Sequence, residues 1–249
     1  IIGSYVPVEM PQIGIFTPVM IWMVLLFVIN SFITSTLPVH ILLQPRDYIN
    51  AQQLVIILIL ICGGIFIGNP KIIAPVFVSD PPGAPALWPF LYIIIACGAI
   101  SGFHSIVSSG TSAKQIANEK HAKAVGFGTM LMEGMLAILV IIAVTAGLGM
   151  RYTSSDGSIL TGQAAFLEHY SSWEAASGLS SKINAFIIGS ANLLEVFGIP
   201  LKIGFTIMGV FLVSFASTTL DTATRLQRYI VCEFSAANNI PFFQNMYAA

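Results

Sequence analysis

The chain has 249 residues, of which 56% are hydrophobic and only 8% are charged. Ordinary globular domains carry about 25% charged residues, so this chain has too few charges to cover a water-exposed surface. This excludes a soluble globular protein. The formal net charge of −1 provides no basic surface for nucleic acid. The composition therefore predicts an integral membrane protein that contacts the lipid bilayer and binds no nucleic acid.

The cysteines give no sign of a metal site or a disulfide framework. Cys62, Cys97 and Cys232 lie far apart in the sequence, so they lack metal-ligand spacing. We interpret them as small buried hydrophobic residues and expect no metal and no cofactor. The first residues show no signal-peptide pattern, and the chain does not begin with methionine. We therefore expect an internal part of a longer membrane protein.

Long apolar segments define the predicted fold class. A membrane-spanning helix needs about 20 mostly apolar residues, and several stretches meet this requirement. The sequence predicts an all-α, polytopic helical membrane protein, with one transmembrane region over residues 1–249. The predicted spans are about 13–37, 52–68, 88–112, 124–149 and 203–220. Segment 183–197 is short and amphipathic, so it is expected to be interfacial, re-entrant or a short span.

The connections between these spans are predicted from their polar and proline-rich composition. A polar turn is expected over 44–48, a loop over the proline-rich stretch 70–89, and a loop or short surface helix over 150–181. Lys and Arg are enriched on the side that holds loop 114–123. By the positive-inside rule, this side is predicted to be cytoplasmic.

One predicted span carries its polar residues on a single helix face. The spacing is three and four residues, which places side chains on one side of a helix. The residues are Ser101, His104, Ser105, Ser108 and Thr111. Polar groups at membrane depth are costly unless they face other helices or water. This polar stripe is therefore a predicted pathway for a transported solute.

Two features of the stripe have alternative interpretations. His104 can relay protons or donate to a substrate carboxylate, or it can be a buried histidine bonded to a carbonyl. Gly98, Gly102 and Gly110 either let the helix unwind or let another helix approach closely. The sequence leaves both questions open.

Glu133 is the only charged residue of the span predicted over 124–149. It lies about ten residues inside the span, or roughly 15 Å along a helix that rises 1.5 Å per residue. This depth is near the middle of a ~30 Å hydrocarbon layer. A carboxylate there must be protonated, paired or hydrated. Burial in general favours the protonated form of a carboxyl group, as proton coupling requires. The alternative is a structural hydrogen bond to a neighbouring helix.

Asp221 and Arg225 are one helical turn apart at the end of the last predicted span, with Thr218 alongside. They form either an ordinary ion pair at the membrane surface, contributing only ~0.2–0.5 kcal/mol, or a gate or a wall of the substrate site. They can pair with each other or with the stretch 44–47. Arg46 and Asp47, beside Pro45, are interpreted as a structural turn.

Four stretches resemble the carbon starvation protein family of bacterial inner-membrane transporters. The most specific is the string Gly-Phe-His-Ser-Ile-Val-Ser-Ser-Gly-Thr, which contains most of the polar stripe. The stretches are Leu37–Tyr48, Ala96–Thr111, Lys114–Glu119 and Thr218–Arg225. The resemblance implies secondary active uptake of peptides or pyruvate, coupled to protons, across the inner membrane during carbon starvation. It also implies an inverted-repeat transporter fold with broken helices that meet at a midplane site.

Functions of other classes are weaker alternatives. A channel or a nutrient-sensing receptor would use the polar stripe as a pore or a signal site, and it would need no proton-binding carboxylate. An intramembrane hydrolase would use Ser108 with His104 as its base, but no loop is present to form an oxyanion site. We therefore do not expect an enzyme.

Overall fold

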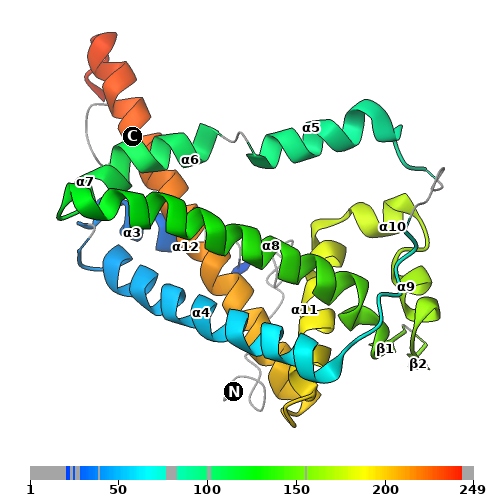
Figure 1. Cartoon of the computed structure of the whole chain (residues 1–249). Helices are drawn as coiled ribbons and strands as arrows, with labels where there is room; N and C mark the ends of the chain where they lie inside the picture. Colours follow the sequence, from blue (N-terminus) through cyan, green and yellow to red (C-terminus); the bar gives the residue numbers. More distant parts are fainter. Residues whose placement is uncertain are drawn as a thin grey trace. The chain divides into compact units, whose positions relative to one another are not determined.

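The structure of the chain is a computed structural model that describes residues 21, 22, 25, 29–38, 40–76, 83–99, 102–154 and 156–242. Helices make up nearly all of its regular structure (Figure 1). Three of them are long and apolar enough to cross a membrane: Leu43–Gly68, Glu119–Gly149 and Leu201–Ala237. The prediction of an all-α membrane protein is confirmed. Most of the span predicted over 13–37 lies outside the described residues.

The described residues form two compact units. The first unit lies within residues 54–99 and 118–210, and the second lies within residues 2–53, 100–117 and 211–249. Two long helices contribute to both units. Helix α4 (Leu43–Gly68) divides after Gln53, and helix α12 (Leu201–Ala237) divides after Val210.

The first unit consists mainly of helices that follow one another along the chain. Besides parts of α4 and α12, it holds α5 (Leu87–Ala99), the 3-10 helix η3 (Glu119–His121), the π-helix η4 (Ala124–Gly128), α8 (Thr129–Thr145), the 3-10 helix η5 (Gly147–Gly149), α9 (Gln163–His169), α10 (Trp173–Ser177) and α11 (Leu179–Glu195). Between η5 and α9, strands β1 (Tyr152–Thr153) and β2 (Ile159–Leu160) pair antiparallel, with Tyr152 opposite Leu160.

Small residues let α11 lie directly against the C-terminal end of α8 (Figure 1). A Cβ atom on Gly189 would lie 2.0 Å from the carbonyl oxygen of Ala143, and one on Gly147 would lie 2.5 Å from the carbonyl oxygen of Gly189. Close backbone contact through small residues is a common way to pack membrane helices. The second half of α11 is buried by this packing. How segment 183–197 lies in the membrane stays a prediction.

Helix α4 begins earlier than its sequence indicates. The polar turn predicted over 44–48 is wrong, because these residues form the first turns of α4, which starts at Leu43. Proline is tolerated in the first turn of a helix, where its missing N–H would have no helical partner. Pro45 therefore does not interrupt the helix, and Arg46 and Asn50 are held on successive turns of regular structure.

The second unit contains a sequence of short helical pieces. Besides parts of α4 and α12, it holds α3 (Ser31–Thr36), α6 (Gly102–Val107), the π-helix η2 (Ser108–Ser112) and α7 (Ala113–Gln115). Within the stretch predicted as one span over 88–112, the structure describes α5 up to Ala99 and α6 from Gly102. A Cβ atom at Gly102 would meet nothing within 4 Å, whereas one at Gly110 would lie 3.4 Å from Leu226 Cδ2. Within the described part of the chain, only Gly110 of these two glycines lies close to another helix.

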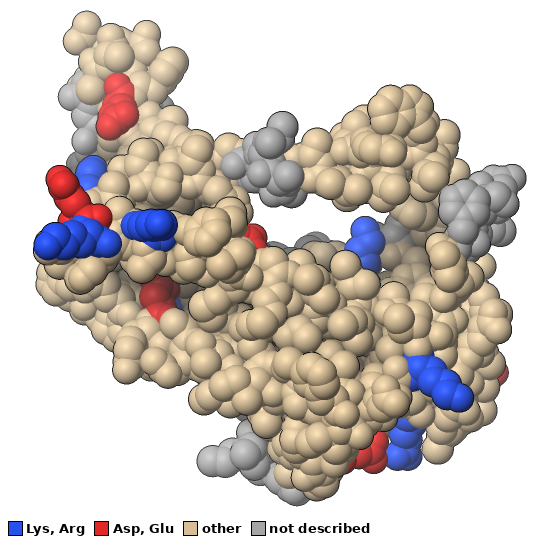
Figure 2. Space-filling model, viewed as in Figure 1, with Lys and Arg blue, Asp and Glu red and all other residues tan. Residues whose placement is uncertain are grey.

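The surface has the apolar character that membrane helices require. On the face shown in Figure 2, charged side chains are few and most of the area is uncharged. Large hydrophobic side chains are exposed along the long helices, including Ile59 and Phe66 of α4, Ile141 of α8 and Val213 of α12. Such a surface is unfavourable in water and suits a lipid environment.

Candidate functional site

A group of buried and half-buried polar side chains joins α3, α4 and α12 within the second unit. We call it the polar seam. It comprises Ser31 of α3, Arg46 and Asn50 of α4, and Ser214, Ser217, Thr218 and Asp221 of α12. The α12 members recur at spacings of three and four, so they share one face of that helix. This face of α12 points towards α4, on which Arg46 and Asn50 are also one turn apart.

Asp221 is the centre of the polar seam. Its side chain is 0% exposed, and its Oδ2 atom forms an ion pair with Nη1 of Arg46. Its Oδ1 atom accepts from the hydroxyl of Ser31 at 3.4 Å and from the amide of Asn30 at 3.5 Å. A buried carboxylate is costly unless it is paired and hydrogen-bonded. The partners from α3 and α4 therefore make this position tolerable for a charge.

The remaining contacts of the polar seam continue along the same two helices. Nη2 of Arg46 donates to the hydroxyl of Ser217, so one guanidinium bridges two successive turns of α12. One turn further along α4, the amide nitrogen of Asn50 donates to the hydroxyl of Thr218, and its amide oxygen accepts from Ser214. Asn50 is buried. Its donor and acceptor are both used, which fixes the register of α4 on α12.

Two arginines of α12 bind the C-terminal end of α3. Nη2 of Arg225 donates to the carbonyl oxygens of Thr34 and Leu37, both at 2.6 Å, and Nη1 of Arg228 donates to the carbonyl oxygen of Ser35. The last carbonyls of a helix lack helical partners and carry partial negative charge, which favours cations there. Asp221 thus has its ionic partner on α4, and the ion pair considered between Asp221 and Arg225 does not form.

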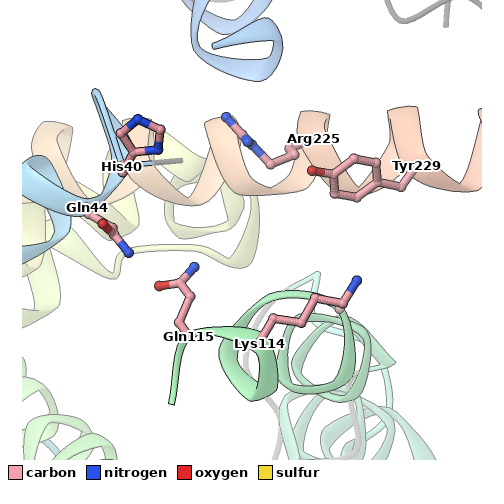
Figure 3. Close-up of a pocket in the computed structure, with 7 residues that line it drawn as sticks. His40, Gln44, Lys114, Gln115, Arg225 and Tyr229 are labelled. Atoms are coloured by element: carbon pink, nitrogen blue, oxygen red, sulfur yellow. The ribbon is translucent and has the colours of Figure 1, made fainter. Parts of the chain in front are cut away.

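A cavity of about 220 Å³ lies beside these arginines in the second unit (Figure 3). It is lined by His40 and Gln44 near the start of α4, Gly110 of η2, Lys114 and Gln115 of α7, and Arg225 and Tyr229 of α12. In Figure 3 the side chains of Lys114 and Gln115 extend from α7 towards α12. Arg225 is buried while Lys114 and Tyr229 are exposed, so Arg225 forms the inner end of the cavity.

The predicted polar stripe does not join the polar seam within the described part of the chain. His104, Ser105 and Ser108 are exposed. The hydroxyl of Ser105 donates to the carbonyl oxygen of Gly102 at 2.9 Å, and that of Ser108 donates to the carbonyl oxygen of Ser105 at 2.8 Å. Ser101 and the side chain of Thr111 lie outside the described residues. The role of the stripe in transport stays a prediction.

Glu133 lies on an exposed part of α8 in the first unit. Among the described residues, no hydrogen bond or ion pair is formed by its carboxylate. Within the described part of the chain, the structure therefore gives no support to the alternative that Glu133 forms a structural hydrogen bond. Its predicted role in proton coupling stays a prediction.

Several residues of the polar seam and the cavity were not predicted as site residues. Arg46 was interpreted as part of a structural turn, and Asn50, Ser214 and Ser217 were not considered. One signal for them is present in the sequence. Polar residues recur every three or four positions along α12: Ser214, Ser217, Thr218, Asp221, Arg225 and Arg228. In a helix long enough to span a membrane, this spacing indicates a buried polar face.

Comparison with known proteins identifies the family. The profile of the carbon starvation protein CstA family matches residues 1–248. The chain belongs to this family. A peptide transporter CstA of Bacillus subtilis is 32% identical over 221 residues, which is 83% of this chain and 37% of the relative. A peptide transporter CstA of Campylobacter jejuni is 32% identical over an aligned length of 264 residues, which covers 92% of this chain and 37% of the relative.

A relative with another named substrate matches a shorter region. The pyruvate/proton symporter BtsT of Escherichia coli is 41% identical over 118 residues, 45% of this chain and 16% of the relative. The chain thus covers well under half the length of these curated relatives. No solved structure matches it significantly. The predicted resemblance to the carbon starvation protein family is confirmed.

Proposed function

We propose that this chain forms part of a secondary transporter that takes up peptides or pyruvate together with protons across the inner membrane of bacteria, in cells short of carbon. Relatives named as peptide transporters and as a pyruvate/proton symporter support the substrate class and the proton coupling. These names do not favour a channel or a receptor. They also support a transport role in place of an enzymatic one.

The buried ion pair between Asp221 and Arg46 is the observation that carries the proposal. It lies between α4 and α12, two of the helices that are long and apolar enough to cross a membrane. Ionisable residues inside membrane helices are rare and mark pathways for ions and substrates. Protonation of Asp221 would remove its attraction for Arg46 and release the contact between α4 and α12. In this proposal the polar seam is a two-state element that a proton can switch.

Glu133 and the polar stripe have complementary proposed roles. Glu133 is another carboxylate within a candidate membrane span, and we assign it to the proton pathway. Ser101, His104, Ser105, Ser108 and Thr111 are assigned to the substrate or proton pathway. Thr218, Asp221 and Arg225 are assigned to the gate or to the wall of the substrate site. These assignments rest on sequence position, on the resemblance and, for Thr218 and Asp221, on their place in the polar seam.

The proposal is tested with the complete protein in liposomes. Labelled pyruvate and labelled dialanine are offered with and without an inward proton gradient, and counterflow exchange is measured with no gradient. A symporter accumulates at least one substrate when the gradient is applied and shows counterflow. Flux that only follows the substrate gradient, without counterflow, would identify a channel and contradict the proposal.

Carboxylate variants then test the coupling. Asp221→Asn and Glu133→Gln remove a charge with little change in shape, so each should keep counterflow and lose accumulation driven by the proton gradient. Asp156→Asn in the exposed turn between β1 and β2 is the control and should behave like the wild type. Normal gradient-driven accumulation in Asp221→Asn or in Glu133→Gln would remove that residue from the proposed proton pathway.

A further inference from the structure

We infer that the cavity between α4, α7 and α12 binds the carboxylate of the transported substrate, with Lys114 and Arg225 as its cationic partners. The inference rests on the proposed function, because that function defines the substrates as small molecules that carry a carboxylate. It adds the binding residues, for which neither the family nor the relatives' names provide an assignment.

The charge of the cavity is the first argument. Among the residues that line it, Lys114 and Arg225 are cationic, and none is acidic. The nearest acidic residue along α12 is Asp221, whose carboxylate already binds Arg46. The other lining groups include the amides of Gln44 and Gln115 and the hydroxyl of Tyr229, all of which can donate hydrogen bonds to an anion. The lining therefore suits an anion and not a cation.

The state of Arg225 is the second argument. The residue is only 3% exposed, and its described partners are two neutral carbonyl groups. Its Nε atom is buried and has no hydrogen-bond partner within the described part of the chain. A buried guanidinium that lacks a counter-ion and has a donor left over is unfavourable. A carboxylate in the adjoining cavity would supply the missing negative charge.

The size and construction of the cavity are the third argument. A volume of about 220 Å³ is below the range of about 300–1,000 Å³ that is typical for drug-sized ligands. It is suited to pyruvate, or to the C-terminal residue of a short peptide whose remaining part lies outside. Gly110 of the π-helix η2 helps to line this space, and a Cβ atom there would lie 3.4 Å from Leu226 Cδ2 of α12. Single-turn π-helical segments are frequent at functional sites.

Binding is tested with the purified complete protein by titration calorimetry at constant ionic strength. The probes are pyruvate, dialanine and dialanine amide, which lacks the terminal carboxylate. The test variant is Lys114→Gln, because Lys114 is exposed and its loss does not disturb a core. Lys120→Gln is the matched control, since Lys120 is also exposed but does not line the cavity. Arg225→Lys is a second test variant that keeps the charge but loses the fork of donors.

The expected result is a dissociation constant for the carboxylate probe that rises roughly tenfold or more in Lys114→Gln, the usual effect of losing one hydrogen bond to a charged group. Arg225→Lys should also bind more weakly, and Lys120→Gln should match the wild type. Dialanine amide should bind less tightly than dialanine. Equal binding in Lys114→Gln and Lys120→Gln would overturn the inference, and so would equal affinity for the acid and its amide.

The same measurements separate this inference from the proposed function. Transport by the wild type with unchanged binding in Lys114→Gln leaves the function in place and overturns the cavity assignment. If carboxylate binding depends on Lys114 but the protein transports nothing, the cavity assignment stands and the proposed transport function is wrong. An anionic lipid headgroup is the competing occupant. If phosphatidylglycerol stabilises the wild type but not Lys114→Gln, while pyruvate and dialanine binding are unchanged, the cavity is a lipid site and the inference is wrong.

Discussion

Arg46 binds Asp221 although the two residues lie 175 positions apart in the sequence. Arg46 stands on the second turn of α4, and Asp221 is fully buried on α12, so their contact holds together two helices that are far apart in the chain. The same guanidinium also reaches Ser217. One side chain thus neutralises the buried charge of α12 and fixes the alignment of the two helices.

A double-mutant cycle should reveal this coupling. Asp221→Asn and Arg46→Gln should each destabilise the complete protein in detergent by about 1–3 kcal/mol. This loss is smaller than the 3–5 kcal/mol that is typical when one partner of a fully buried ion pair is removed, because Arg46 is 25% exposed. The double variant should lose less than the sum of the two, because neither charge is then left unmatched. The measurement is equilibrium unfolding in denaturant, followed by tryptophan fluorescence.

The exposed pair of Arg151 and Glu195 is the matched control for this cycle. Its N–O distance is 3.7 Å, and both side chains are more than 40% exposed. Exposed ion pairs typically contribute only ~0–1 kcal/mol. The cycle of Arg151→Gln and Glu195→Gln should therefore show a small coupling. If the coupling between Arg46 and Asp221 is no larger than that of the control, the buried pair does not hold α4 and α12 together.

The sequence predicts the class of fold better than it predicts which side chains pair with one another. Long apolar segments identify membrane helices because the bilayer fixes their length and composition. The spacing of Thr218, Asp221 and Arg225 also placed them on one helix face, as the structure does. Their partners depend on how helices from distant parts of the chain pack. The sequence allows Asp221 and Arg225 to pair with each other or with residues 44–47, and the structure pairs Asp221 with Arg46 of α4.

Local signals misled the interpretation in the region of Pro45. Four polar residues and a proline in succession are typical of a turn, but the first turn of a helix accepts the same residues. Arg46 and Asn50 were therefore not recognised as members of one helix face. A periodic search along α4 would have placed them one turn apart.

Gly189→Ala should destabilise the first unit strongly. The added Cβ atom would lie 2.0 Å from the carbonyl oxygen of Ala143, and backbone cannot move aside as a flexible side chain can. Helices α8 and α11 would have to separate, at a cost of roughly 1–3 kcal/mol or more. The measurement is the temperature of unfolding of the complete protein in detergent.

Gly134→Ala makes the same change on α8 where a Cβ atom meets nothing within 4 Å, which makes it the control. Alanine is favoured over glycine inside a helix by about 1 kcal/mol, so this variant should be as stable as the wild type or more so. Equal stability of the two variants would show that α8 and α11 do not pack as closely as described.

Asn192 links α11 to the chain segment that follows α8. Its amide nitrogen donates to the carbonyl oxygens of Gly147 at 2.9 Å and of Arg151 at 2.7 Å, and the residue is 1% exposed. Asn192→Ala removes both donors and leaves two carbonyl groups without them, at a cost of about 1–3 kcal/mol. Asn184→Ala on the exposed side of α11 is the control and should cost much less. Similar unfolding temperatures for both variants would contradict the structural role of Asn192.

The region around His169, at the end of α9, should lose stability when the pH falls. Burial lowers the pKa of His169 below the usual 6.5, and the hydrogen bond to the carbonyl oxygen of Ser181 offsets this only in part. This carbonyl can only accept, so Nε2 of His169 carries a proton and donates at 3.1 Å. The rings of Tyr152 and Tyr170 contact the imidazole, with centroids 5.7 Å and 4.9 Å away. The site therefore favours the neutral form.

The direction of the pH effect follows from this lowered pKa. The unfolded region binds a proton as the pH falls through about 6.5, whereas the folded region does so only at lower pH. Stability is therefore full above pH 6.5 and is lost progressively as the pH falls from there towards the pKa of the folded form. Hydrogen exchange of the amides of α9, corrected for intrinsic rates, should show faster opening at pH 5.5 than at pH 7.5. His169→Gln keeps a donor for Ser181 but cannot titrate, so its exchange should depend less on pH; an unchanged dependence would assign the effect to another group.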